Sequence, residues 1–370
     1  MNRKKALYRY ELGNMKWFLV AGMAGCLLVL FFFHDCYRQM TALESAFDGS
    51  GMMYFSGVTS FVGTLAVGMT DITTIALIAL SVMVMFQFKD YHERNRREFI
   101  VALPFSQRER FVAKFVVGCG IITVICAVFC VGVFALRSVY YPSIVKQFLV
   151  YPYYQLLCGN DTWFQTLRVV LLLWVTMLAA YAVFTVIHTL ISRGIIASLV
   201  SIGVMATPYY LLCMSYVYAE MFRPAGNHHA MFDGTLAQVC RAFLGRAYLK
   251  ETVEIGVGDI DTISTSAYVD FGSLWAVFLT VIIVFVICTI LSYRINAKQD
   301  GAKYGATIPQ TGPRVFFSVG IALCFSFPIA SLLSFFMGKD GVDIVVAVVQ
   351  IIVMIVLYLV NQKIFKRVIR

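Results

Sequence analysis

The stretch KDYHERNRREFIVALPFSQRERFVAK, residues Lys89–Lys114, is the densest cluster of charge in the chain and lies between two long apolar runs. Acid–base pairs at i,i+4 spacing with the acid first, such as Asp90 and Arg94, favour a helix over its first part. Pro104 ends that helix, because proline lacks a backbone N–H and restricts the residue before it. We therefore expect the chain to leave one apolar run, form a short amphipathic helix over 90–103 and return into the next run.

A second helix is predicted to begin directly after this proline. Ser106 and Glu109 have the spacing of a capping box, in which the hydroxyl of the N-cap and the carboxylate three residues later bond to each other's backbone N–H groups. Phe99 and Leu103 give the preceding charged helix an apolar edge. An apolar edge on a charged helix, held between two apolar runs, predicts a docking surface for a partner.

The composition of the whole chain defines its class. Sixty per cent of its residues are hydrophobic and only 14% are charged, which excludes an ordinary soluble globular protein. Several apolar runs reach about 20 residues, long enough to cross a bilayer as a helix. We therefore expect an all-α polytopic membrane protein with about eight transmembrane helices, at 17–36, 62–88, 112–136, 167–191, 195–219, 273–293, 315–337 and 343–361.

The charges indicate which side of the membrane each connecting segment faces. With the N-terminus inside, the cytoplasmic segments hold 21 of the 30 Lys and Arg, whereas 13 of the 20 Asp and Glu lie in the outer segments or at the outer ends of spans. The positive-inside rule then places both termini in the cytoplasm. The net charge of +10 comes from Lys and Arg residues that are concentrated on one side of the membrane. We therefore expect this chain to contact membrane lipid rather than nucleic acid.

The segments between the apolar runs differ in character. Residues 1–16 are predicted to be a basic interfacial segment, and 192–194 a tight cytoplasmic hairpin. The largest outer segment, 220–272, has an amphipathic piece at Leu236–Leu249, followed by a β-branched, acidic stretch of strand- or loop-like character. Residues 294–314 contain Gly and Pro and are predicted to connect a core over 1–293 to a final pair of helices with a basic tail over 315–370.

Motifs for several catalytic classes do not occur in the sequence. There is no G-x-x-x-x-G-K-[ST], H-E-x-x-H, G-x-S-x-G or C-x-x-C pattern, so ATP hydrolysis by a P-loop, zinc proteolysis, serine hydrolysis and redox chemistry lack a starting point. We expect no catalytic residue, no metal and no cofactor in this chain. Among the ten cysteines, the sequence does not decide whether Cys158 and Cys240 form a disulfide, and free thiols are the favoured interpretation.

Polar residues within the apolar runs are the usual candidates for function in a membrane protein. Asp71 is the clear acid among them and would suit a proton or cation site, although a cap on a helix beginning near it is the favoured interpretation. His188 is expected to be an interfacial or packed histidine rather than a proton relay. The pair His228-His229 lacks a third ligand and is better assigned to a loop than to a metal site.

One segment resembles a known family. Residues Glu98–Ser106, EFIVALPFS, followed by Arg110 and Lys114, are similar to the E-x-L-x-x-L-P-x-S…K segment after the second span of type-2 ATP-binding-cassette exporter permeases. The basic N-terminal segment, the short fourth-to-fifth connection and the outer segment between spans five and six also resemble that family. The final pair of helices is a departure, because the family's common core has six spans.

The resemblance implies a function. In that family the short cytoplasmic helix docks on a separate ATPase subunit, so ATP and Mg²⁺ would be bound by the partner. A second permease, identical or homologous, would complete the complex in the plasma membrane of a bacterium. The cargo would be amphipathic or apolar, such as a drug, an antimicrobial peptide or a lipid. The residues expected to couple this chain to the ATPase are Glu98, Phe99, Leu103, Pro104 and Ser106.

Two other classes of function remain open at this point. A secondary transporter would use Asp71, and Asp71→Asn would then abolish transport whereas Leu103→Asp would not. A membrane sensor that does not transport would bind a ligand or partner through the outer segment 220–272. An ATPase gene encoded beside this one would count against the sensor.

Overall fold

The computed structural model describes most of the chain. The described residues are 3–43, 61–92, 105–150, 161–222, 235–243, 249–250, 268–269, 274–298, 311–337 and 342–366.

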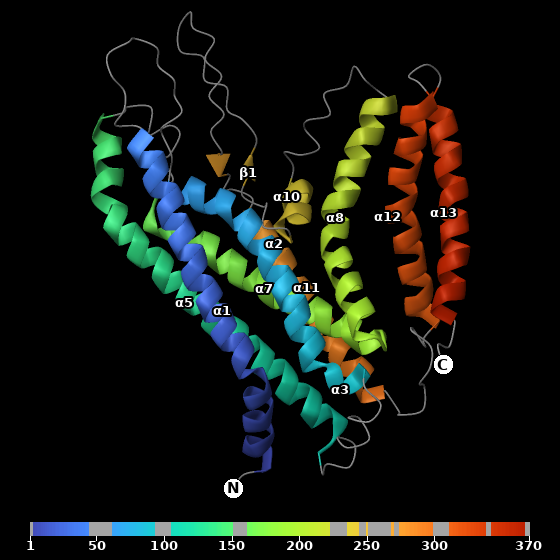
Figure 1. The fold of residues 1–370 in the computed structure, drawn as a ribbon, viewed down its shortest axis with the longest axis horizontal. Coiled ribbons are helices and arrows are strands. Elements are labelled where there is room, and N and C mark those ends of the chain that lie inside the picture. The colour runs from blue at the N-terminus through green and yellow to red at the C-terminus, as the bar shows by residue number, and fades with distance from the viewer. Residues whose placement is uncertain are drawn as a thin grey trace, which may run out of the picture. The chain divides into compact units, whose positions relative to one another are not determined.

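Almost all of these residues are helical (Figure 1). A two-stranded antiparallel sheet pairs Leu249 with Val269 and Lys250 with Tyr268. The elements are α1 (Arg3–Leu43), α2 (Phe61–Gln87), α3 (Lys89–His92), α5 (Gln107–Val150), α7 (Trp163–Leu190), α8 (Gly194–Phe222), α10 (Thr235–Ala242), β1 (Leu249–Lys250), β2 (Tyr268–Val269), α11 (Leu274–Lys298), α12 (Thr311–Met337) and α13 (Val342–Lys366).

The all-α class and the membrane character are confirmed. Within the described residues, six helices are long and apolar enough to span a bilayer, and α2 and α12 contain shorter apolar stretches. The six candidate spans are Lys4–Gln39, Gln107–Val145, Trp163–Leu190, Gly194–Tyr216, Leu274–Asn296 and Val348–Phe365.

Two helices run well past the boundaries that hydropathy suggested. The interfacial segment 1–16 is not separate from the first span, because α1 is one helix of 41 residues, about 62 Å long at 1.5 Å per residue. The third span does not stop at residue 136, since α5 continues for 44 residues and includes Pro142. Both helices are about twice the length needed to cross a 30 Å hydrocarbon core.

The chain divides into two compact units, each built from several segments. The first comprises Met1–Ala79, Ala113–Ala180 and Arg241–Phe285, and the second comprises Leu80–Val112, Tyr181–Cys240 and Val286–Arg370.

In the first unit, α1 and α5 pack side by side and run parallel. Their contacts join Glu11 to Lys114, Cys26 to Ile125 and His34 to Tyr140, at separations of 103, 99 and 106 residues. A nearly constant separation along both helices is possible only if they point the same way. The residues that begin α1 and those that begin α5 therefore lie at the same end of this pair.

The second unit contains the hairpin of α12 and α13 and, from Tyr181 onward, the hairpin of α7 and α8. Helices α7 and α8 are joined by 191–193, which confirms the predicted tight connection. Helices α12 and α13 pack closely side by side (Figure 1), and Gln362 near the end of α13 donates a hydrogen bond to Ser318 near the start of α12, 3.2 Å away. Apolar residues of α7, α8, α12 and α13 form a buried core cluster: Ile187, Ile191, Ala197, Phe317 and Phe365.

In the predicted outer segment, a helix and a pair of short strands are formed. Helix α10 occupies part of the amphipathic piece predicted at Leu236–Leu249. Strand β2 lies within the β-branched, acidic stretch for which strand or loop character was expected, and β1 lies just before that stretch.

Candidate functional site

The capping box predicted at the start of α5 is formed. The backbone N–H of Ser106 donates to Oε2 of Glu109 at 3.0 Å, and the backbone N–H of Glu109 donates to Oγ of Ser106 at 3.2 Å. This reciprocal pair satisfies two of the donors that a helix N-terminus leaves unpaired. Of the five residues expected to couple the chain to an ATPase, Ser106 is thus placed, and the others lie outside the described residues: Glu98, Phe99, Leu103 and Pro104.

The other end of the charged segment is held by a histidine. Helix α2 ends at Gln87 and the short helix α3 follows, with His92 as its last residue. Nδ1 of His92 lies 3.1 Å from the carbonyl oxygen of Ser192, and its Nε2 lies 3.1 Å from Nδ1 of His188. Ser192 is in the turn between α7 and α8, and His188 is in the last turn of α7. The beginning of segment 89–106 is therefore bonded to the α7–α8 hairpin.

These partners determine which ring nitrogens carry protons in the neutral pair. A carbonyl oxygen only accepts, so Nδ1 of His92 is the donor to Ser192, and Nε2 of a neutral His92 must then accept. Nδ1 of His188 is therefore the donor between the rings, and Nε2 of His188 accepts from Oγ of Ser198 at 3.5 Å. Oγ of Ser198 also lies 3.5 Å from the carbonyl oxygen of Ser81, so its one proton can be donated to only one of these two acceptors at a time.

Packing around the two rings is close. His188 is 1% exposed, and its ring centroid lies 6.4 Å from that of Phe88. A Cβ atom on Gly194 would lie 3.2 Å from Cδ2 of His92 and 3.1 Å from Cγ of Met85, tighter than an ordinary van der Waals contact. Glycine at the first position of α8 thus lets the imidazole of His92 approach the turn. The prediction that His188 is interfacial or packed agrees with this burial.

Asp71 does not cap a helix. Helix α2 begins at Phe61, so Asp71 lies ten residues inside it, about 15 Å along the axis. Its side chain is exposed on the helix surface. The expectation that it marks the start of a helix was wrong, because residues 61–70 before it are already helical.

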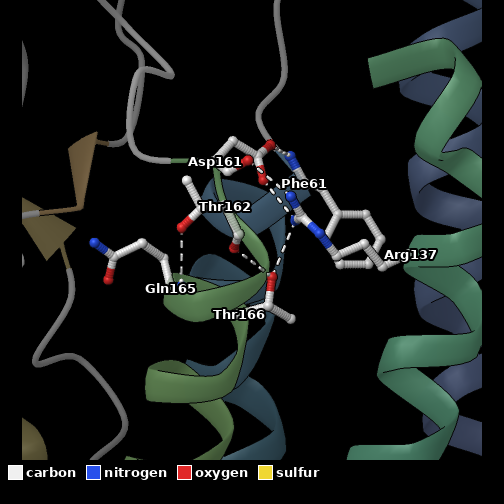
Figure 2. Close-up of polar contacts among 6 residues, drawn as sticks. All are labelled: Phe61, Arg137, Asp161, Thr162, Gln165 and Thr166. Atoms are coloured by element: carbon white, nitrogen blue, oxygen red, sulfur yellow. Dashed lines mark hydrogen bonds and ion pairs between the residues drawn. The ribbon is translucent and has the colours of Figure 1, made fainter. Parts of the chain in front are cut away.

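A second polar cluster joins the first residue of α2, the middle of α5 and the beginning of α7 (Figure 2). Nη1 of Arg137 donates to Oδ1 of Asp161 at 2.6 Å and to Oγ1 of Thr166 at 3.0 Å. Nη2 donates to the carbonyl oxygen of Asp161 at 2.7 Å. The other carboxylate oxygen of Asp161 accepts from the backbone N–H of Phe61 at 2.7 Å. One carboxylate thus connects a guanidinium to the N-terminus of a neighbouring helix.

This cluster is fully enclosed. The side chains of Arg137 and Asp161 are 2% and 0% exposed. The guanidinium carbon lies 5.3 Å from the ring centroid of Phe61 and 5.1 Å from that of Trp163, within range of a cation–π interaction. Thr162 caps α7 by accepting from the backbone N–H of Gln165 at 3.2 Å. Almost every polar group here is satisfied, and Nε of Arg137 alone has no partner among the described residues of the cluster.

A second buried charge pair lies between α1 and α5. Nζ of Lys114 is 3.2 Å from both carboxylate oxygens of Glu11, and the two side chains are 4% and 5% exposed. Lys114 closes the family-like motif, but here its charge is turned into the protein. It is therefore a structural residue rather than part of an exposed docking face.

The described residues give little support for a metal site or a reactive thiol. No group of three or more His, Cys, Asp or Glu in that part of the chain could hold a metal ion, and His228-His229 lies outside it. Cys158 also lies outside the described residues, so the Cys158–Cys240 disulfide is untested. Burial raises the pKa of the Cys240 thiol above its usual value, which makes it a weak nucleophile.

Sequence reasoning missed most of these contacts. The predicted span 112–136 ends one residue before Arg137, and Asp161 falls between the predicted spans 112–136 and 167–191. His92 lies within the charged segment 89–114 and carries no motif of its own. One signal in the sequence could have indicated the Arg137 contact. Arg137 is a single charge at the end of an apolar run, and such a charge needs a partner if the helix continues past it.

No family model, curated protein or solved structure matches this chain. Its function must therefore be inferred from its own residues.

Proposed function

We propose that this chain is the permease subunit of a bacterial ATP-binding-cassette exporter. The observation that carries the proposal is the anchoring of segment 89–106 at both ends. Its first residues are bonded to the α7–α8 hairpin through His92, and its last residues form the capping box that starts α5. A force applied between these anchors would reach several membrane helices, as a coupling segment requires.

The orientation of the chain in the proposal is supported by the parallel α1–α5 pair. The ion pair of Glu11 with Lys114 joins the basic stretch 1–16 to the charged segment 89–114. Both stretches are rich in Lys and Arg, so the positive-inside rule puts this end in the cytoplasm. Eight crossings, with α2 and α12 counted as spans, then leave both termini on that side.

The mechanism in the proposal is mechanical. A pair of separate ATPase subunits binds ATP and Mg²⁺, and their closure pushes on segment 89–106, with Glu98, Phe99, Leu103, Pro104 and Ser106 as the contact and transmission residues. The push tilts α2 and α5 as rigid bodies and changes access to a cavity formed with a second permease, identical or homologous. Membrane helices with few charges suit amphipathic or apolar cargo, such as a drug, an antimicrobial peptide or a lipid.

A pull-down in mild detergent tests the proposal. The tagged wild-type chain is expected to bring down a P-loop ATPase, and Leu103→Asp is expected to lose it. Arg193→Asp is the control, since it adds an acid at an exposed position in the α7–α8 turn and should retain the ATPase. If no nucleotide-binding protein copurifies with the wild type, the exporter proposal is wrong.

Asp71 supports a second candidate, a secondary transporter. It is an acid on the surface of α2, well inside the helix, and acids within spanning helices are costly and therefore usually functional. In that case Asp71→Asn would abolish transport by the purified chain in proteoliposomes, whereas Leu103→Asp would leave transport unchanged. The exporter proposal expects the opposite pattern.

A further inference from the structure

We infer that the hydrogen bond between His92 and His188 is a second transmission path, which carries movement of segment 89–106 into the α7–α8 hairpin. The inference rests on the proposed function and extends it, because the capping box at Ser106 connects the segment to α5 only. With this link, a push on one segment would move α7 and α8 together with α2 and α5.

The first argument is where the link lies. His92 is the last residue of α3, at the point where the charged segment leaves α2. Its two ring nitrogens contact two different parts of one hairpin, the turn at Ser192 and the last turn of α7 at His188. A single side chain thus holds the segment to the hairpin at two points, which resists both sliding and rotation.

The second argument is that the path continues past the two rings. Oγ of Ser198 on α8 lies 3.5 Å from Nε2 of His188 and 3.5 Å from the carbonyl oxygen of Ser81. Oγ of Ser81 on α2 donates to the carbonyl oxygen of Ser198, 3.2 Å away. The chain of contacts from α3 therefore passes through α7 and α8 and returns to α2, so the four elements share one hydrogen-bonded path.

The third argument is the chemical nature of the link. Two neutral imidazoles joined by one N–H···N bond form a contact that is specific in direction but carries no formal charge. A neutral hydrogen bond contributes about 1 kcal/mol net, so it can break and re-form during a transport cycle. A Cβ on Gly194 would lie 3.2 Å from Cδ2 of His92, so glycine at the start of α8 leaves room for the imidazole.

Nitrogen NMR tests the link directly. The chain has five histidines, so selective ¹⁵N-histidine labelling of the purified protein gives few signals. We expect a nitrogen–nitrogen coupling across the hydrogen bond from Nδ1 of His188 to Nε2 of His92, with both rings as Nδ1–H tautomers. The coupling should vanish in His92→Phe. Its absence from the wild-type protein, or an Nε2–H tautomer for His188, would overturn the inference.

Transport per ATP tests the role of the link. In proteoliposomes containing the complete complex, His92→Phe should retain the ATPase subunit and its hydrolysis but lose about fivefold in transport per ATP, the size that follows from one net hydrogen bond of about 1 kcal/mol. His92→Gln, whose side-chain oxygen can accept from His188, should recover part of the loss. If His92→Phe fails to fold, transport per ATP is compared between His92→Gln and the wild type instead. Arg193→Gln, an exposed neighbour in the turn, is the control and should behave as wild type.

The outcomes separate this inference from the proposed function. If the ATPase copurifies and His92→Phe transports as efficiently per ATP as the wild type, the link carries no movement, and the exporter proposal then rests on the copurified ATPase and on the anchor at Ser106. If no ATPase copurifies with the wild-type chain, the exporter proposal is wrong, and the coupling role of the link is rejected with it. Partial recovery in His92→Gln, together with unchanged Arg193→Gln, would support the inference.

Discussion

The Arg137 cluster of the first unit and the His92 cluster of the second both tie helix ends together, but they do so with different chemistry. Arg137 and Asp161 are a fully buried ion pair with bonds to Thr166 and to the N-terminus of α2. His92 and His188 are joined by one hydrogen bond between ring nitrogens 3.1 Å apart.

The difference indicates which contacts can move. Separating a buried ion pair leaves two charges without compensation in a medium of low dielectric constant, which costs several kcal/mol. Separating two neutral imidazoles costs about 1 kcal/mol, an amount that a conformational cycle can supply. We therefore expect the Arg137 cluster to stay fixed during function and the His92 cluster to be the one that shifts.

The largest effect is expected at the ion pair. Arg137→Met leaves the Asp161 carboxylate buried without its cation, and should lower the free energy of unfolding by about 3 to 5 kcal/mol. Denaturant unfolding of the purified protein in detergent measures this. The double variant Arg137→Met/Asp161→Leu should regain most of the loss, because it removes both charges. A single variant as stable as the wild type would mean that this cluster is not a fixed point.

A smaller effect is expected from close packing in the same unit. A Cβ on Gly22 of α1 would collide with the side chain of Ile125 on α5, whereas nothing lies within 4 Å of a Cβ on Gly25. Gly22→Val should therefore cost about 1 to 3 kcal/mol through overpacking. Gly25→Val is the matched control on the same helix and should cost less in the same unfolding assay. Equal losses for the two variants would contradict the close α1–α5 contact.

The neutral link should contribute less than the ion pair. His92→Phe removes the bonds to Ser192 and His188 and should lower the free energy of unfolding by about 1 kcal/mol. The assay is the one used for Arg137→Met, with Arg193→Gln as a silent control. A loss as large as that of Arg137→Met would remove the contrast between a fixed and a movable contact.

The smallest effect is expected at the start of α5, and it should be local. Ser106→Ala removes one half of the capping box and costs about 0.5 to 1 kcal/mol. Amide hydrogen exchange should therefore speed up in the first turn of α5 without a change in global unfolding. Arg108→Ala, at an exposed position of the same turn, should leave the exchange rate nearly unchanged. Equal exchange in both variants would show that the cap does not hold this turn.

Features determined by near neighbours could be predicted from the sequence. The capping box depends on two residues three apart, and the α7–α8 turn depends on a three-residue gap between two apolar runs. Helix ends were predicted less well. The α1 and α5 helices extend past their apolar cores because they pack on each other from Glu11–Lys114 to His34–Tyr140, and hydropathy carries no information on such pairing.

By itself the sequence determined that this is an all-α membrane protein with a charged segment between two of its helices. That follows from local physics, since each apolar run must satisfy its own backbone hydrogen bonds within a bilayer. Only the tertiary structure decided which polar residues meet. Arg137 and Asp161 are 24 residues apart and His92 and His188 are 96 apart. Interactions between polar groups depend on their separation in space, and at such sequence distances only the packing of the helices determines it.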